Sequence, residues 1–331
     1  MEQNKIIPIF FASDKNYLQY LAVAAKSLSD KAGAEYEYKI HVLTDDLTES
    51  DLDEIRFLLR DNVTIEVADV TKKMSSIRSK VALRDYYTPS IYFRLFIPTM
   101  YPQYRKVIYL DADIIVNADI AMMYQEELGN NYLGAVLDET VWSSQDFIYY
   151  VKNALGVSEK QYFNSGVLLM NLDQFRNNNV EEDFYRWVND SYGGTVAPDQ
   201  DYLNCISKNK VEYLDPGWNK MPMGDRLQDD QLYIIHYNMF MKPWKYCNVM
   251  YEEYFWHVAK RTPYYEKLLK QRESYTMEEM ERDRLAAENL VKLAINIANS
   301  NVNYRAVVLD KQMKRVDKLS SKDINTIPQR S

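Results

Sequence analysis

The chain has 331 residues, with 40 basic against 48 acidic side chains and a net charge of −8. This length allows one large domain, or a main domain with an appendage. The acidic balance argues against nucleic acid as a partner, because phosphate backbones select basic surfaces.

Cysteine and glycine usage narrows the class further. The two cysteines, Cys205 and Cys247, have no ligand-like spacing, which argues against a disulfide framework or structural zinc and favours a reducing compartment. None of the nine glycines falls in a Gly-rich phosphate loop, so Walker-type and Rossmann dinucleotide sites are not expected. Signal-peptide and membrane-span patterns are absent from the sequence, and we expect a cytoplasmic protein.

Short apolar runs alternate with helical patterns through the first two thirds of the chain, an order that is typical of βαβ units in an α/β fold. Helices are predicted at 18–28 and from a capping-box-like start at Thr48, with apolar residues on one face. Strands are predicted at 6–11, 38–43, 64–70, 107–116, 132–137 and 167–170.

Strand signals almost vanish after about residue 262, where helices are predicted at 264–271 and 277–299. We therefore expect a main domain at 1–261 and a helical C-terminal appendage at 262–331. The tail after Asp310 carries six basic and two acidic residues. Peripheral contact with the inner face of a membrane, a homodimer contact through the C-terminal helices, and plain packing with a solvated tail are the alternatives for this end.

Two carboxylates, Asp111 and Asp113, interrupt the apolar run 107–116 that predicts a buried strand. Side chains at i and i+2 of a strand share a face, so both carboxylates are expected to point the same way. Such a pair repels unless a proton or a metal neutralises it. Mg²⁺ and Mn²⁺ prefer oxygen ligands completed by substrate phosphates. The pair therefore predicts a divalent ion that holds a phosphorylated substrate.

Further acids follow the other predicted strands, namely Asp14, Asp45, Asp46 and Asp138. Open α/β sheets bind ligands outside the carboxyl ends of their strands, so these acids are expected to gather at one crevice. The alternative is that they start turns or cap helices, which applies above all to Asp45 and Asp46.

Other segments carry residues that a metal–phosphate site needs. Asp14 and Asn16 follow the first strand, where they could contact a base edge or a ribose. Arg94 lies in an apolar helical context and needs an anionic partner, with an internal salt bridge as the alternative to a ligand. Asn164 and Gly166 precede a buried strand and could approach a ligand closely.

Two later segments complete this set. Asp199 and Gln200 stand at a probable helix start after Pro198, where capping explains the acid but not the amide. His236 follows a short apolar strand and could complete the metal site, although a lone histidine is more often a structural residue. Lys242, six residues later, could neutralise a leaving phosphate.

The ordered motifs FASDKNY, YFRL, YLDAD, YFNSGVLLMNL, PDQDYLN and IIHYxxxxKPW, between residues 6 and about 246, resemble glycosyltransferase family 8. The resemblance implies a GT-A fold, in which a Rossmann-like mixed sheet flanked by helices binds the nucleotide. It also implies retaining transfer of a hexose from UDP-galactose or UDP-glucose to a saccharide, glycolipid or glycoprotein acceptor, and with it a place in cell-surface polysaccharide synthesis.

By motif position, the resemblance implies that Mn²⁺ or Mg²⁺ binds to Asp111, Asp113 and His236. It implies a uridine site at Ala12, Asp14 and Asn16. The catalytic candidates are Asp199 and Gln200, with Gln200 beneath the anomeric carbon. Further donor contacts would come from Arg94, Ala112, Asp138, Asn164 and Lys242, with Lys242 on the diphosphate.

One departure and two rival functions are part of this interpretation. Met239 stands where family members often carry glycine. A haloacid-dehalogenase-type phosphatase also uses an Asp-x-Asp pair, but there a Gly-Thr-like turn follows, whereas Ile114 and Ile115 continue an apolar run. A nucleotide-sugar-binding protein without turnover is the other rival. For the acceptor, the segment 72–88 and the aromatics Trp142, Phe147, Tyr149 and Tyr150 are candidates for a lid or a sugar-stacking surface. The alternative is chance, because 28 tyrosines make such clusters common.

Overall fold

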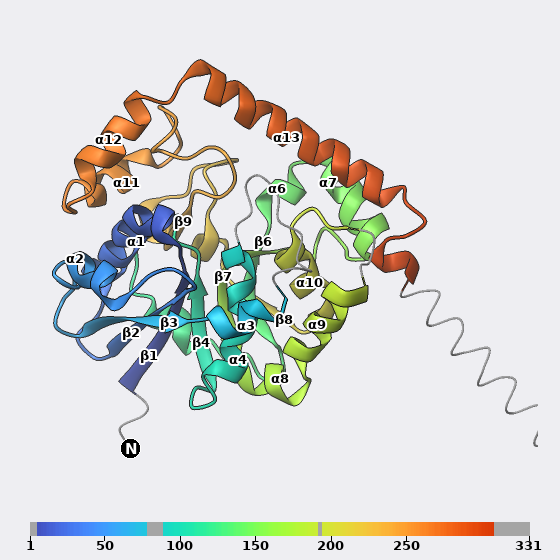
Figure 1. Ribbon diagram of the computed structural model, residues 1–331, viewed down its shortest axis with the longest axis horizontal. Coiled ribbons are helices and arrows are strands. Elements are labelled where there is room, and N and C mark those ends of the chain that lie inside the picture. Colours follow the sequence, from blue (N-terminus) through green and yellow to red (C-terminus); the bar gives the residue numbers. More distant parts are fainter. Residues whose placement is uncertain (1–4, 78–88, 191–193, 308–331) are drawn as a thin grey trace, which may run out of the picture.

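The computed structural model describes residues 5–77, 89–190 and 194–307. Its centre is a seven-stranded mixed sheet in the order β3-β2-β1-β4-β7-β6-β8, with helices on both faces (Figure 1). The strands of this sheet are β1 (Ile6–Ala12), β2 (Glu37–Thr44), β3 (Val63–Asp69), β4 (Lys106–Leu110), β6 (Leu133–Leu137), β7 (Phe163–Asn171) and β8 (Val211–Tyr213). A second, two-stranded sheet pairs β5 (Ile114–Val116) with β9 (Ile234–His236).

The direction of the strands divides the main sheet. β3, β2, β1 and β4 run parallel to one another, whereas β7 is antiparallel to both β4 and β6. β8 is parallel to β6. The carboxyl ends of four neighbouring strands therefore meet at one edge, which is where ligands bind in open α/β sheets.

The helices and their bounds are α1 (Leu18–Lys31), α2 (Asp53–Arg56), α3 (Thr71–Ser75), α4 (Ile97–Met100), α5 (Ala121–Gln125), α6 (Glu139–Trp142), α7 (Gln145–Tyr150), α8 (Leu172–Asn177), α9 (Val180–Asp190), α10 (Pro198–Ile206), α11 (Glu252–Ala259), α12 (Tyr265–Glu273) and α13 (Met277–Ala298). A 3-10 helix, η4, covers Pro89–Phe96.

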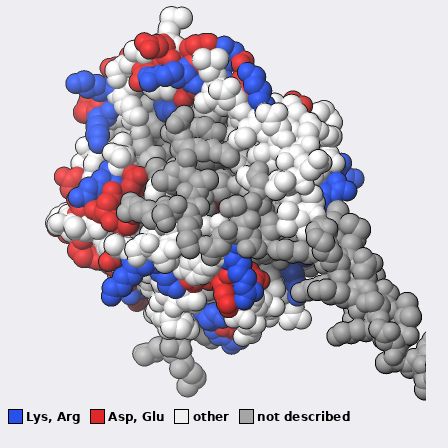
Figure 2. All heavy atoms as spheres, turned by 45° about the vertical axis from the view of Figure 1, so that its right-hand side comes forward, with Lys and Arg blue, Asp and Glu red and all other residues white. Residues whose placement is uncertain are grey.

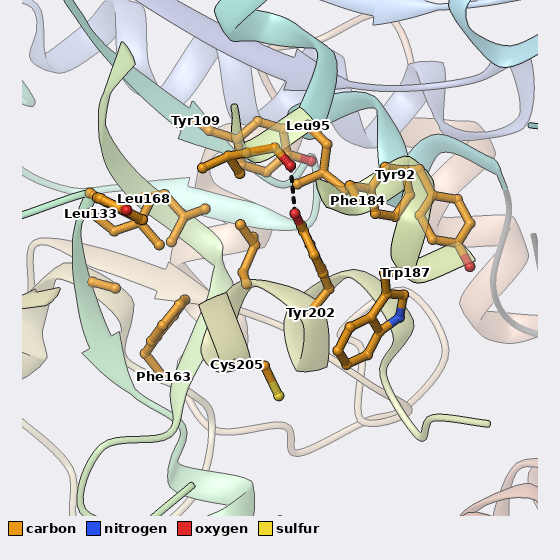
Figure 3. Packing of buried hydrophobic residues seen from close by; sticks show 14 of the residues in the cluster. Tyr92, Leu95, Tyr109, Leu133, Phe163, Leu168, Phe184, Trp187, Tyr202 and Cys205 are labelled. Carbon is orange, nitrogen blue, oxygen red and sulfur yellow. Dashed lines mark hydrogen bonds between the residues drawn. The ribbon is translucent and has the colours of Figure 1, made fainter. Parts of the chain in front are cut away.

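Alternation of side chains along the central strands builds a core on each face of the sheet. Phe10 and Tyr109 belong to one buried cluster, whereas Phe11 and Leu110, their neighbours in sequence, belong to the other. This period of two is what an extended strand imposes. In the first cluster, Tyr202 of α10 packs against Phe184 and Trp187 of α9 (Figure 3), and its hydroxyl donates to the Val180 carbonyl at 2.5 Å.

The predicted strands and helices mostly match the structure, with two corrections. The helix predicted from Thr48 is one 3-10 turn (Glu49–Leu52) followed by α2, although the capping box of Thr48 and Asp51 is present. The run 107–116 is wrong as a single strand, because β4 ends at Leu110 and β5 begins at Ile114 in the other sheet. The Asp-Ala-Asp segment is therefore the crossing between two sheets.

The chain after residue 261 is helical where it is described. Leu268 of α12 joins a buried cluster with residues of α1 and α11. α13 crosses the top of the molecule from the α12 side to α7 (Figure 1). The tail after Asp310 lies outside the described residues. Within the described residues, no helix is long and apolar enough to cross a membrane. Acidic and basic side chains lie next to one another in several places on the surface in Figure 2.

Candidate functional site

The strand register places two of the expected donor segments side by side. Phe11 of β1 pairs with Leu110 of β4 in parallel register. Ala12 and Asp111 come next along the two chains, so the FASDKNY and DAD segments leave the sheet as neighbours. The Asp111 N–H donates to the Gly166 carbonyl of β7 at 2.7 Å, which fixes the start of the crossing segment.

A cluster of metal-ligating side chains forms where the chain enters the second sheet. Ile114 pairs with His236 in the antiparallel β5–β9 ladder, and the Tyr237 N–H donates to the Asp113 carbonyl at 2.9 Å. His236 Nε2 consequently lies 3.3 Å from Asp113 Oδ1 and 3.8 Å from Asp111 Oδ2. One ligand atom of each residue falls within 4.8 Å of the others. Two carboxylates and an imidazole suit Mn²⁺ or Mg²⁺.

The second nitrogen of His236 is held by a residue that the sequence analysis did not identify. Nδ1 lies 2.9 Å from Asn219 Oδ1, an oxygen that can only accept, so Nδ1 carries the proton and Nε2 presents its lone pair to the cluster. Asn219 Nδ2 in turn donates to Asn164 Oδ1 at 3.0 Å. Such an outer hydrogen bond is typical of metal-binding histidines. Asn219 sits in a 3-10 turn, Pro216–Asn219, with no sequence signal that marks it.

Gly166 is needed for this convergence. A Cβ atom at this position would lie 2.3 Å from His236 Cε1 and 2.6 Å from Asp111 Oδ2, closer than real contacts allow. From the sequence, Gly166 is expected to let the backbone approach a ligand closely. The structure instead shows that the missing side chain admits the ligating residues themselves.

Lys242 completes the charge balance beside Asp113. Its Nζ lies 2.5 Å from Asp113 Oδ2 and 2.6 Å from the Tyr237 carbonyl oxygen. Burial raises the pKa of Asp113, but neighbouring positive charge, above all the Lys242 ammonium, outweighs burial and holds the pKa of that carboxyl well below its usual range. Asp113 is therefore ionised and available as a ligand throughout the neutral range.

Arg94 of η4 joins two carboxylates, so the salt bridge that was one expected alternative is present. Nη2 donates to Asp111 Oδ1 at 2.9 Å, and Nε lies 3.3 Å from Asp199 Oδ2. The guanidinium also stacks over the Tyr109 ring at 4.2 Å. Burial lowers the pKa of Arg94, but Asp111, Tyr109 and Asp199 raise it by more, and the group stays charged.

A second network surrounds Gln200 at the start of α10. Its Nε2 donates to Asp138 Oδ2 at 3.0 Å, and its Oε1 accepts from the Ser165 N–H at 2.9 Å. Asn164 Nδ2 donates to the same Asp138 oxygen at 3.1 Å. Ser165 Oγ donates to Asp199 Oδ2 at 3.1 Å. Ser165 Oγ also lies 3.4 Å from Gln200 Oε1, so the amide of Gln200 is held in one orientation.

Asp201, for which the sequence predicted no role, supports this network from within the core. It is fully buried and accepts from Tyr150 Oη at 2.6 Å and Tyr162 Oη at 2.7 Å. Burial raises the pKa of Asp201 to about 6. Tyr162 Oη also lies 3.2 Å from Gln200 Nε2. An acid directly after Gln200 was visible in the sequence, but its inward orientation was not.

A cavity of about 1320 Å³ lies over the metal-ligand cluster and the Gln200 network. It brings together most of the predicted site residues: Arg94, Asp111, Asp113, Asp138, Asn164, Asp199, Gln200, His236 and Lys242. Of the expected acceptor aromatics, Phe147 and Tyr150 line it.

Several predicted residues lie outside the lining of this cavity. Asp14 caps the 3-10 turn after β1 by accepting from the Asn16 and Tyr17 N–H groups, and Asp46 accepts from the Lys15 N–H. Asp14 and Asp46 thus make the turn and cap contacts that were the alternative to a ligand role. A uridine contact of Asp14 stays a prediction. The predicted acceptor segment 72–88 lies outside the described residues after 77.

Met239 lines the cavity in a backbone conformation that favours glycine. Its φ is +56°, in the left-handed region, and its side chain is 36% exposed. The sequence analysis singled out this position because a glycine often stands there in the family that the motifs resemble. A methionine here carries backbone strain and also occupies space in the cavity.

Comparisons with known proteins agree with this geometry. The family model for glycosyl transferase family 8 matches residues 8–248. A Haemophilus influenzae relative with a glycosyltransferase name is 27% identical over 214 residues, 65% of this chain and 63% of that protein. General stress protein A of Bacillus subtilis is 25% identical over 224 residues, 66% of this chain and 75% of that protein.

A solved structure of the galactosyltransferase LgtC with donor and acceptor sugar analogues has a TM-score of 0.66 and 28% identity, covering 78% of this chain and 96% of that one. The bifunctional glycosyltransferase WbbM, at 24% identity and a TM-score of 0.70, shares the fold over 82% of this chain and 52% of its own. The chain thus spans little more than half of WbbM and less than two thirds of the Haemophilus relative. It has the GT-A fold and belongs to glycosyltransferase family 8.

Proposed function

We propose that this protein is a metal-dependent, retaining hexosyltransferase that moves galactose or glucose from a UDP-sugar to a glycan, glycolipid or glycoprotein. The observation that carries the proposal is the convergence of Asp111, Asp113 and His236 at the edge of the sheet where the donor motifs meet. Family membership supports glycosyl transfer rather than phosphate-ester hydrolysis, so the phosphatase alternative is not carried further.

The donor set fits a divalent ion in charge as well as in ligand type. Asp111, Asp113, Asp138 and Asp199 supply four carboxylates, and Arg94 and Lys242 supply two cations. A divalent cation would balance the remaining two negative charges, with His236 neutral. When bound, such an ion polarises the diphosphate of the donor and stabilises UDP as a leaving group.

The protein's own residues then take the following roles. Lys242 faces the diphosphate, and Ala12, Asp14 and Asn16 contact uridine at the end of β1. Arg94, Ala112, Asp138, Asn164 and Asp199 orient the donor sugar. Arg94 is already fixed by two carboxylates, which preorganises the sugar site before the donor binds.

The proposed retention of anomeric configuration rests on the position of Gln200. Breaking the sugar–phosphate bond places positive charge on the anomeric carbon, and the partial negative charge of Gln200 Oε1 would stabilise it. An amide is a poor nucleophile, so we favour same-face attack, in which the departing phosphate takes the acceptor's proton. A solved structure of an LgtC active-site variant has glutamate in place of glutamine, which supports a role for a glutamine in that relative.

The test is a UDP-release screen over UDP-galactose, UDP-glucose and their N-acetyl analogues, with Mn²⁺, with Mg²⁺ and with chelator. We expect metal-dependent release from one of the two hexose donors, and retention in the product by NMR of the new linkage. Tight donor binding with no turnover under any condition would favour the nucleotide-sugar-binding alternative. A glycosyl adduct trapped on Gln200 would overturn same-face attack.

The cellular setting follows from the same proposal. We propose that the protein acts in the cytoplasm, on an acceptor that is assembled there. For residues 262–331 we propose either peripheral contact with the inner face of the membrane or a homodimer contact through the C-terminal helices. Fractionation of cells, and light scattering of the purified protein, would test the two.

A further inference from the structure

Helix α13 forms one wall of the cavity that the metal-ligand cluster also lines. Near its N-terminus, α13 is hydrogen-bonded to the loop that follows Lys242. Asp283 accepts from Lys245 Nζ at 3.1 Å, Tyr246 Oη at 3.1 Å and Tyr275 Oη at 2.7 Å. The start of the helix is therefore tied to the segment that supplies the proposed diphosphate ligand.

The C-terminal half of α13 packs against the opposite side of the cavity. Leu290, Ala294 and Ile297 are buried in the cluster that contains Tyr150 and Val151 at the end of α7. Tyr149 Oη donates to Asn299 Oδ1 at 2.8 Å. α13 thus lies along the cavity from the loop after Lys242 to α7. Figure 1 shows the helix running from the α12 side to α7.

Between these two contact regions, four side chains on one face of α13 line the cavity. Arg282, Leu285, Ala286 and Asn289 are spaced i, i+3, i+4 and i+7, which places them in one row along the helix. At a rise of 1.5 Å per residue, the row is roughly 10 Å long. We call this row the α13 stripe.

Three of the four stripe residues, Arg282, Leu285 and Asn289, are exposed, and Ala286 is partly buried. Arg282 is 69% exposed, and its ion-pair partner Glu279 lies 3.8 Å away. Leu285 is 42% exposed although it lines the cavity. Arg284, on the outer face, is instead paired with Glu281 and Glu288. The stripe therefore presents a guanidinium, an apolar centre and an amide to whatever enters the cavity.

The size of the cavity leaves room for a second ligand beside a nucleotide-sugar. Pockets for one small molecule are typically about 300–1,000 Å³, and this cavity is about 1320 Å³. Resting on the proposed function, we propose that the α13 stripe binds the acceptor saccharide and contacts more than its terminal sugar. Arg282 and Asn289 hydrogen-bond sugar hydroxyls, and Leu285 with Ala286 packs against an apolar sugar face.

The C-terminal helix α13 lies outside the family motifs, which end near residue 246, and acceptor binding would be its role. The side chains of the α13 stripe also indicate the chemical class of the acceptor. The row is about 10 Å long, with polar ends and an apolar middle. These features suit a saccharide of two or more units rather than a single sugar.

The test compares transfer with donor hydrolysis, in which water replaces the acceptor. Mono-, di- and trisaccharides of glucose and galactose serve as probes, with the same disaccharides also supplied as long-chain alkyl glycosides. Arg282→Ala and Asn289→Ala are expected to lower the ratio of transfer to hydrolysis about fivefold to tenfold for di- and trisaccharides, and less for monosaccharides. Arg284→Ala, which removes the same charge from the outer face, should keep the wild-type ratio.

The outcomes separate this inference from the proposed function. Equal losses with free and alkyl-linked disaccharides would show that the stripe binds the saccharide, whereas a loss confined to the alkyl glycosides would show contact with the aglycone and overturn the proposal. Unchanged ratios in both variants, or donor hydrolysis by the wild type without transfer to any probe, would also overturn it. Absence of donor hydrolysis in the wild type would instead contradict the hexosyltransferase itself.

Discussion

Arg94 and Asp111 form an ion pair in which only the arginine is buried, with Nη2 and Oδ1 2.9 Å apart, and it connects a 3-10 helix to the crossing between the two sheets. The same guanidinium lies 3.3 Å from Asp199 on α10. One side chain therefore holds a proposed metal ligand and a proposed sugar ligand in a fixed relation. This link is why the metal end and the sugar end of the site are expected to respond together to mutation.

Replacement of Arg94 tests this coupling. Arg94→Lys keeps the charge but loses the planar fork, and a lysine cannot reach both carboxylates with the same geometry. We expect kcat/KM for the UDP-sugar to fall about 100-fold, with a stability loss of roughly 1–3 kcal/mol in urea unfolding. Arg176→Lys, at an arginine paired with Asp173 away from the cavity, is the control. Wild-type kcat/KM in Arg94→Lys would show that the fork is not needed.

Gly166→Ala should damage the metal site without removing any ligand. The added Cβ meets His236 and Asp111 at distances that force one of them to move. We expect Mn²⁺ affinity, measured by calorimetry in the presence of UDP, to fall about 10- to 100-fold. Gly134→Ala is the matched control, because its Cβ would contact only leucine side chains, at 3.1 Å or more. Equal Mn²⁺ affinity in Gly166→Ala and wild type would contradict the close approach.

His41 gives stability a pH dependence that is separate from the site. Burial lowers the pKa of its imidazole to about 4, against Glu66, which raises it. The folded state therefore binds fewer protons than the unfolded state between pH 6.5 and 4, and His41 makes the protein lose stability as the pH falls through that window. The contribution is at most about 3 kcal/mol. Urea unfolding at pH 7 and pH 4.5 should show a smaller loss in His41→Phe than in wild type, and an equal loss would contradict the shift.

Met239 allows backbone strain to be separated from side-chain effects. At φ +56°, glycine is unstrained, whereas alanine keeps the strain and loses only the side chain. We expect Met239→Gly to be more stable than Met239→Ala by about 1 kcal/mol in thermal unfolding. Both variants remove the same bulk from the cavity, so they should change donor KM alike. A Met239→Ala protein as stable as Met239→Gly would show that this φ carries no strain.

The order of strands and helices was predictable because hydrophobic periodicity and turn residues act locally. The parallel half of the sheet and the C-terminal helices were found in this way. The break between Leu110 and Ile114 was not, because an apolar run looks the same whether it stays in one sheet or crosses to another. The pairing of Ile114 with His236 that causes the break is a long-range contact with no local signal.

The site was predictable to the extent that residue types alone imply chemistry. The carboxylates, His236 and Lys242 were expected together and are together. Asn219 and Asp201 were not expected, since their roles depend on which way a buried side chain points. Asp14 and Asp46 show that an acid after a strand can also be satisfied by nearby N–H groups, so residue type alone does not separate a cap from a ligand.

The central claim is that Asp111, Asp113 and His236 bind a divalent ion that in turn binds the diphosphate of UDP. The most direct measurement is titration calorimetry of UDP into the protein with Mn²⁺ and with chelator, for wild type, for Asp113→Asn and for Asp69→Asn, a strand-end acid outside the cavity lining. We predict that UDP affinity falls at least about 100-fold in chelator and in Asp113→Asn, with Asp69→Asn unchanged. Equal UDP affinity with and without metal in the wild type would contradict the account.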